Sequence, residues 1–200
     1  VMNPSSERMN TLRTTLHRGL LENLDFNFKN GSANTLIYEH GTVFEKKGDT
    51  LKDIDQVSNF SCLVHGNFYD KSVHFDGVEN NFFLLKGIAT NAFQTLTKAK
   101  VKFVEDKSSY CDIFYRIVDN KKNTVGSIGV IAGSFLDKLD IAHKTDVCVM
   151  DINTTFFTEH FNHSVKVKDI ILYPVVTRDL NFKLDSDANL GEVCSAMKSA

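Results

Sequence analysis

Residues 111–131 read CDIFYRIVDNKKNTVGSIGVI, and this stretch decides how the rest of the chain is interpreted. In Cys111–Val118 apolar side chains recur at every second position, which is the period of a β-strand. Residues 119–123, DNKKN, have the composition of a tight turn, and residues 125–131 return as a second, glycine-bearing strand. The stretch therefore predicts an antiparallel β-hairpin.

On the N-terminal side of this hairpin the pattern predicts two helices and two strands. Apolar residues three and four apart predict a helix over Met9–Phe28, ended by Asn30 and Gly31. Apolar segments at residues 35–44 and 58–68 predict the two strands. The second helix is expected over residues 81–98, because its apolar side chains fall on one helical face.

Three more segments flank the hairpin. A short strand is expected at residues 100–104, a short helix at residues 134–139 and an apolar strand at residues 146–153. Strands that come in runs, without alternating one for one with helices, are typical of an α+β fold with an antiparallel sheet. We therefore predict an antiparallel sheet flanked by helices.

A second small unit is expected to begin near residues 166–168, where the character of the sequence changes. A strand is predicted over Ile170–Leu184 and a helix from Asn189 to Ala200. Arg178 and Asp179 within that strand are read as an edge-strand turn with a salt bridge. We expect the chain to be a piece of a longer protein that ends inside this unit.

Composition and charge exclude several classes of protein. The chain is 42% hydrophobic and 24% charged, as in ordinary soluble domains, and its formal net charge is -2. A domain that binds nucleic acid by itself usually has a clustered basic excess, and the sequence shows none. No segment has the run of about 18 apolar residues that a membrane span needs. We expect a cytoplasmic protein without a membrane partner.

The sequence contains no strong metal or nucleotide motif. His160 and His163 are close enough to share a metal on a helix, but no further ligand stands beside them, and we interpret them as surface or helix-end residues. The glycines of Gly126–Gly129 do not have dinucleotide-binding spacing and are interpreted as a strand packed closely on a neighbour. The cysteines are interpreted as buried, reduced thiols. They are Cys62, Cys111, Cys148 and Cys194.

Four stretches, in this order, resemble the beta subunit family of phenylalanyl-tRNA synthetases. The first runs from NPSSE at residues 3–7 to LRTTL and GLL, which end at residue 21. The others are IYEHGTVF at residues 37–44, FFLLKG at 82–87 and YPVVTRDL at 173–180. The chain departs from the family pattern at Arg18, His40 and Leu84, and in the segment GVIAG at residues 129–133. These departures put side-chain contacts in question and leave the apolar pattern intact.

The resemblance implies a fold and two domains. Residues 1–165 would form a non-catalytic copy of the class II aminoacyl-tRNA synthetase core, an antiparallel sheet flanked by helices. Residues 166–200 would be the truncated start of a ferredoxin-like anticodon-binding domain. The partners implied are the alpha subunit, in a heterotetramer of two alpha and two beta chains, and tRNA. ATP and magnesium would be used by the whole ligase complex, with no cofactor in this fragment.

The resemblance also implies that this region has no catalytic residues of its own. A class II site needs an arginine at the strand after its first motif loop to hold the ATP phosphates, and this chain has Glu45 after Val43 and Phe44. The late glycine-rich element with a second arginine is missing. Arg13, Lys86 and Arg178 are the candidate contacts to tRNA or to the alpha subunit. The alternatives are a stand-alone RNA-binding or protein-interaction module, or an independent enzyme, built on the same fold.

Overall fold

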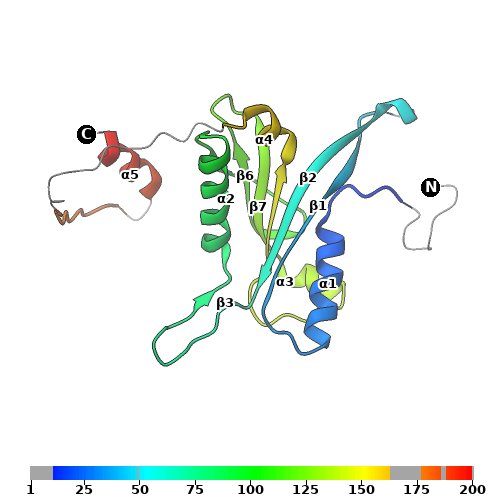
Figure 1. Ribbon diagram of the computed structural model, residues 1–200, viewed down its shortest axis with the longest axis horizontal. Coiled ribbons are helices and arrows are strands. Elements are labelled where there is room, and N and C mark those ends of the chain that lie inside the picture. The colour runs from blue at the N-terminus through cyan, green and yellow to red at the C-terminus, as the bar shows by residue number, and fades with distance from the viewer. Residues whose placement is uncertain (1–10, 49, 163–176, 186–187, 200) are drawn as a thin grey trace. The chain divides into compact units, whose positions relative to one another are not determined.

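The computed structural model describes residues 11–48, 50–162, 177–185 and 188–199 (Figure 1). The chain divides into two compact units, Val1–His163 and Ser164–Ala200. The described part of the second unit contains one helix, α5 (Leu190–Ser199), where the sequence predicts it.

The first unit is built on a six-stranded sheet in the order β1-β2-β8-β7-β6-β5, in which every neighbouring pair is antiparallel. The predicted α+β class with an antiparallel sheet is therefore confirmed. The strands are β1 (Thr35–Lys46), β2 (Ile54–His65), β5 (Lys102–Glu105), β6 (Cys111–Val118), β7 (Thr124–Ile131) and β8 (Cys148–Asn153). A separate two-stranded sheet pairs β3 (Asn67–Tyr69) with β4 (Val78–Glu79), and a 3-10 turn, Leu51–Asp53, precedes β2.

The predicted hairpin is the β6–β7 pair, and its turn is held by one carboxylate. Oδ1 of Asp119 accepts hydrogen bonds from the backbone N–H groups of Lys121 and Asn123, each at 2.8 Å. The glycines of β7 lie close to neighbouring strands, as predicted: a Cβ at Gly129 would stand 2.7 Å from the carbonyl oxygen of Ile113. Only a residue without a side chain allows this approach.

One face of the sheet is covered by α2 (Phe82–Leu96) and by α4 (Thr154–His160), as Figure 1 shows for α2. The side chain of Asn81 caps α2 by accepting a hydrogen bond from the Leu84 N–H at 3.0 Å. The core on this side is apolar and dense. Its largest buried members are Leu85, Phe93, Ile117, Ile128, Met150 and Phe156.

The opposite face is covered by α1 (His17–Lys29) and α3 (Gly133–Lys138). Leucines spaced three and four apart on α1 point into this second core because they share one helical face. Its buried members include Leu20, Leu21, Leu24, Leu63, Leu136 and Val149.

The predicted start of the first helix is wrong. The structure begins α1 at His17, and the described residues before it, from Thr11, are not helical. The reason is a tertiary hydrogen bond: the Arg13 carbonyl accepts from the Phe44 N–H at 2.9 Å, so this segment follows β1. The apolar spacing within this segment does not show that its backbone bonds to a distant strand instead of continuing the helix.

Two predicted strands also differ. The strand expected over residues 58–68 breaks at Gly66, whose φ of +76° turns the chain between β2 and β3. Of the strand expected over residues 170–184, the first part lies outside the described residues, and residues 177–184 form no strand. A strand requires a partner for its hydrogen bonds, and the described part of the second unit offers none.

Candidate functional site

A row of polar side chains crosses the sheet on the face that α1 covers. The strand register places five residues side by side, one on each of five adjacent strands. Ser61 and Asp151 each stand two positions along their strands from Leu63 and Val149, which pack under α1. Because side chains alternate between the two faces of a strand, the row lies on the same face as these two apolar residues. The row consists of Glu39, Ser61, Asp151, Ser127 and Arg116.

Asp151 is the centre of the row. Its Oδ2 atom lies 2.8 Å from Nε2 of His17, at the first turn of α1. Its Oδ1 atom accepts a hydrogen bond from the hydroxyl of Ser61. His17 and Ser61 are both buried, and the Tyr110 hydroxyl lies 3.3 Å from Nδ1 of His17. The result is a connected polar network between the helix and the sheet.

This network contains the residue types of a hydrolytic triad, but in the wrong order. In a working triad the imidazole bonds the nucleophilic hydroxyl and takes its proton. Here the Ser61 hydroxyl bonds the carboxylate of Asp151, so His17 is not its base. Burial, followed by the charges of Cys111 and Asp151, raises the pKa of Tyr110 to about 12, which keeps this phenol protonated. The geometry is that of a structural network.

Both arginines near the row are paired with carboxylates. The Arg13 guanidinium lies 2.5 Å from Oε1 of Glu39, and its Nε donates to the Thr42 carbonyl at 2.9 Å. At the other end of the row Nε of Arg116 lies 2.7 Å from Oδ2 of Asp106. Each of these two cations is therefore already neutralised by an acid of the same chain.

The three residues predicted from sequence do not converge. Arg13 lies beside Glu39 at the row, whereas Lys86 belongs to α2 on the opposite face, where its Nζ stands 5.0 Å from the centroid of the Phe103 ring. Arg178 is exposed in the second unit. Arg13 and Lys86 therefore cannot act as one site. Glu45 is exposed near the end of β1, opposite Asp55 in the register.

The cysteines and histidines fit the sequence interpretation in part. Burial raises the pKa of Cys62 to about 11 and, together with Asp146, that of Cys148 to about 12, so both are inert thiols. Cys111 is half-buried, and Cys194 is exposed, contrary to the prediction, because the described side chains of α5 include no buried one. His160 ends α4, and His163 lies outside the described residues. Among the described residues no group of His, Cys, Asp or Glu could hold a metal.

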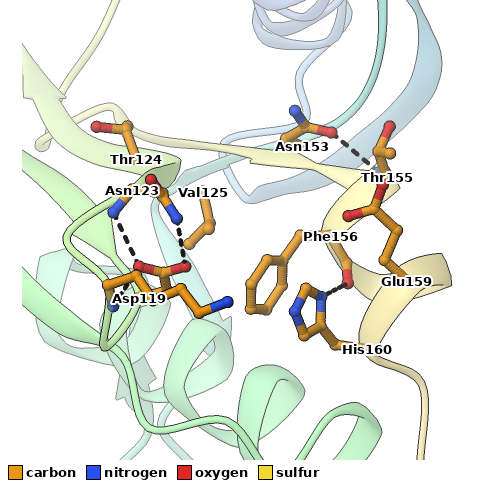
Figure 2. Close-up of a pocket in the computed structure, with 10 residues that line it drawn as sticks. Asp119, Asn123, Thr124, Val125, Asn153, Thr155, Phe156, Glu159 and His160 are labelled. Carbon is orange, nitrogen blue, oxygen red and sulfur yellow. Dashed lines mark hydrogen bonds between the residues drawn. The ribbon is translucent and has the colours of Figure 1, made fainter.

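A pocket of about 330 Å³ opens between the β6–β7 turn and α4, as Figure 2 shows. Asn123 and Thr124 line it from the turn, and Asn153, Phe156 and His160 line it from the end of β8 and from α4. Sequence analysis missed this pocket and the Asp151 network for the same reason. Their members come from separate strands, and only the register of the sheet brings them together.

Comparison with known proteins gives two kinds of likeness. The family model described as the phenylalanyl tRNA synthetase beta chain CLM domain matches residues 1–154. The beta subunit of phenylalanine–tRNA ligase from Lactococcus lactis subsp. lactis (strain IL1403) is 26% identical over 100% of this chain, which covers 25% of that relative. The corresponding subunit from Syntrophus aciditrophicus (strain SB) is 28% identical over 94% of this chain and 23% of its own length.

The chain thus spans about a quarter of the length of the curated relatives it matches. Among solved structures, pyrrolysyl-tRNA synthetase from Desulfitobacterium hafniense superposes with a TM-score of 0.55 at 11% identity, over 73% of this chain and 48% of that one. At this identity the likeness concerns the fold alone. No helix in the described ranges has the length and apolar character to cross a membrane.

Proposed function

The chain belongs to the family of phenylalanyl tRNA synthetase beta chain CLM domains, and from this premise we propose that it is a non-catalytic part of the beta subunit of a phenylalanine–tRNA ligase. In this role it supports assembly with an alpha subunit, in a heterotetramer of two alpha and two beta chains, and it supports tRNA binding. ATP and magnesium serve the whole complex, which works in the cytoplasm. Residues 166–200 begin an anticodon-binding domain, and the change of compact unit at Ser164 supports that boundary.

The observation that carries the proposal is the chemistry of the polar row. A triphosphate needs cations whose charge is not already shared with a carboxylate. Arg13 and Arg116 are each paired with an acid, and Asp151 stands at the centre of the row. The residues of the row therefore do not fit a nucleotide, and no reaction step is assigned to them. The exposed Glu45 near the end of β1 adds a further negative charge.

The assembly role is supported by exposed apolar side chains on β1. Leu36 is 46% exposed and Tyr38 is 73% exposed, although both lie in a regular strand. The Tyr38 ring stacks on that of Phe60, with centroids 5.6 Å apart and planes at 25°. An aromatic surface on an outer strand is typical of a region that another chain covers. We assign the alpha subunit as that chain.

Co-purification tests this assignment. A tagged alpha subunit is expected to retain the 200-residue chain and to lose it when Tyr38→Ser removes the exposed ring. Tyr69→Ser is the matched control, because Tyr69 is 57% exposed on the separate small sheet. A chain that stays monomeric and is not retained by the alpha subunit would remove the assembly role. Equal loss with both variants would reject the surface on β1.

A further inference from the structure

Five lysines from two segments that are separate in sequence gather at one end of the first unit. Lys98, Lys100 and Lys102 lie between α2 and the start of β5, and Lys121 and Lys122 lie in the β6–β7 turn. The segments meet because Lys102 pairs with Val118 in the sheet register, directly before that turn. We call these five residues the lysine end.

The pocket of Figure 2 adjoins the lysine end. The Asn162 N–H donates to the Leu96 carbonyl at 3.0 Å, which joins the segment after α4 to the last turn of α2. Lys121 lines the pocket together with residues of α4. Figure 1 shows the C-terminal end of α2, the β6–β7 turn and α4 at the same end of the sheet. Lys121 therefore belongs both to the lysine end and to the lining of the pocket.

The charge of this surface contrasts with that of the chain, whose formal net charge is -2. All five lysines are exposed, and no described carboxylate forms an ion pair with the ammonium groups of Lys100, Lys102 or Lys122. Of the two acids lining the pocket, Asp119 is occupied by the turn. Burial opposes its ionisation, but hydrogen bonds from Asn123 and Lys121, with the Lys121 charge, outweigh it and lower the pKa of Asp119.

The pocket contains groups that suit a nucleotide. The ring of His160 stacks on that of Phe156, with centroids 4.3 Å apart and planes at 18°, and its Nδ1 donates to the Phe156 carbonyl at 3.0 Å. That bond directs Nε2 away from the helix backbone. Asn123 and Thr124 add exposed amide and hydroxyl groups from the turn. A volume of about 330 Å³ is at the small end of ligand pockets.

We propose that the lysine end binds the phosphate backbone of RNA and that the adjoining pocket receives one nucleotide of it. The inference rests on the proposed tRNA-binding role and names the surface that performs it. Lysines contribute affinity by neutralising phosphates, while amide, hydroxyl and ring groups beside them contact sugars and bases. An acidic protein as the alternative ligand would account for the lysines and would leave the pocket without a function.

The test uses the 200-residue chain with lysines Lys102, Lys121 and Lys122 changed to glutamine, which removes charge and keeps the aliphatic stems. Binding to fluorescently labelled phenylalanine tRNA is followed by anisotropy over a range of salt concentrations. We expect the dissociation constant at low salt to rise about tenfold or more. The slope of log K against log salt should fall by about 0.7–0.9 for each phosphate that the variant no longer neutralises.

The matched control changes Lys71, Lys107 and Lys138 to glutamine. These exposed lysines lie at the opposite end of the sheet, in the β3–β4 loop, the β5–β6 loop and α3. The control chain should bind tRNA as the unaltered chain does. Equal weakening by both triple variants would mean that total charge decides binding, and it would overturn the assignment to the lysine end.

Two single variants test the pocket. His160→Ala is expected to weaken tRNA binding without changing the salt slope, because it removes a ring and no permanent cation. Glu159→Gln is expected to tighten binding, since it removes an acid that lines the pocket. If neither variant changes the affinity, the pocket does not receive a nucleotide.

The outcomes separate this inference from the proposed function. Tight tRNA binding that survives removal of the three lysines rejects the surface and leaves the tRNA-binding role standing. Absence of tRNA binding by the unaltered chain rejects both. Poly-glutamate that competes as well as unlabelled tRNA at equal charge would show a general polyanion surface and reject RNA as its ligand.

Discussion

The Nε2 atom of His17 lies 2.8 Å from the Oδ2 atom of Asp151, which ties the first turn of α1 to the middle of β8. The same half-buried carboxylate accepts a hydrogen bond from the Ser61 hydroxyl, so α1, β2 and β8 meet at one acidic side chain. His17 and Ser61 are buried, and a buried polar group is costly when its partner is removed. We expect this network to orient α1 on the sheet.

Breaking this pair should destabilise the fold strongly. Asp151→Ala is expected to lower the free energy of unfolding by about 1–3 kcal/mol, because it leaves the buried Ser61 hydroxyl without its acceptor and the buried His17 without its ionic partner. Urea unfolding measures the change. Asp112→Ala, at an exposed position of β6, is the control and should change stability by less than about 0.5 kcal/mol.

A double-mutant cycle checks the coupling. The combined destabilisation in His17→Ala with Asp151→Ala should be smaller than the sum of the two single effects, because both variants remove the same interaction. Strict additivity would show that the two side chains stabilise the protein independently, and it would contradict the network.

The glycines offer a pair of opposite predictions. Gly129→Ala should cost about 1–3 kcal/mol, because the new Cβ would meet the Ile113 carbonyl at 2.7 Å. Gly87→Ala lies in the middle of α2, where the new Cβ would have no atom within 4 Å apart from neighbouring residues and the backbone of the helix itself, and it should stabilise the chain by about 0.5–1 kcal/mol. Thermal unfolding of both variants measures the signs. A Gly129→Ala variant as stable as the unaltered chain would contradict the packing described for β7.

His65 predicts a pH dependence of stability. Its Nδ1 lies 2.9 Å from the Ala33 carbonyl, and its Nε2 accepts from the Lys144 N–H at 3.3 Å, which is the arrangement of a neutral ring. Burial lowers the pKa of His65, the Ala33 hydrogen bond acts against this, and the His143 charge adds to it. Stability from this ring is therefore complete above the unfolded pKa of about 6.5 and is lost as the pH falls toward the lower folded value.

The measurement is the unfolding temperature at about pH 7.5 and about pH 5.5. The unaltered chain should lose more on acidification than His65→Asn. The exposed His74 gives the control, since His74→Asn should behave as the unaltered chain does. An identical decrease in the His65 variant would show that other groups cause the acid sensitivity.

The paired arginines predict that the polar row binds no triphosphate. Calorimetric titration with ATP and magnesium, with or without phenylalanine, should give no heat of binding in the variant with Lys102, Lys121 and Lys122 changed to glutamine, in which the lysine end is neutralised. Glu39→Gln, which frees the guanidinium of Arg13 from its carboxylate, should be the variant in which weak triphosphate binding appears. Saturable binding of ATP by that lysine variant would contradict the non-catalytic role.

The features that could be predicted from sequence are those set by neighbours along the chain. The β6–β7 hairpin follows from local alternation and from the turn at Asp119, and α2 follows from its apolar stripe and its Asn81 cap. The start of α1 was mispredicted because the apolar spacing runs on into a segment that the β1 backbone binds.

The two candidate sites were out of reach for a related reason. Ser61 and Asp151 become neighbours only through the β2–β8 register, and Lys102 approaches the β6–β7 turn only through the β5–β6 register. Each lysine segment looks like an ordinary solvated charge in the sequence, and no local window shows that residues 98–102 and 121–122 meet in space. The pairing of strands that are distant along the chain could not be predicted from the sequence alone.

Arg13 has a consequence for solubility that its charge does not suggest. It occupies the rim of β1 like one residue of a further strand, because its carbonyl accepts from the Phe44 N–H and its guanidinium donates to the Thr42 carbonyl. An uncovered rim invites a second molecule to add itself edge to edge, which is the first step of fibrous aggregation. Arg13 thereby covers part of the rim against neighbouring molecules, and a chain lacking its side chain is expected to aggregate more readily.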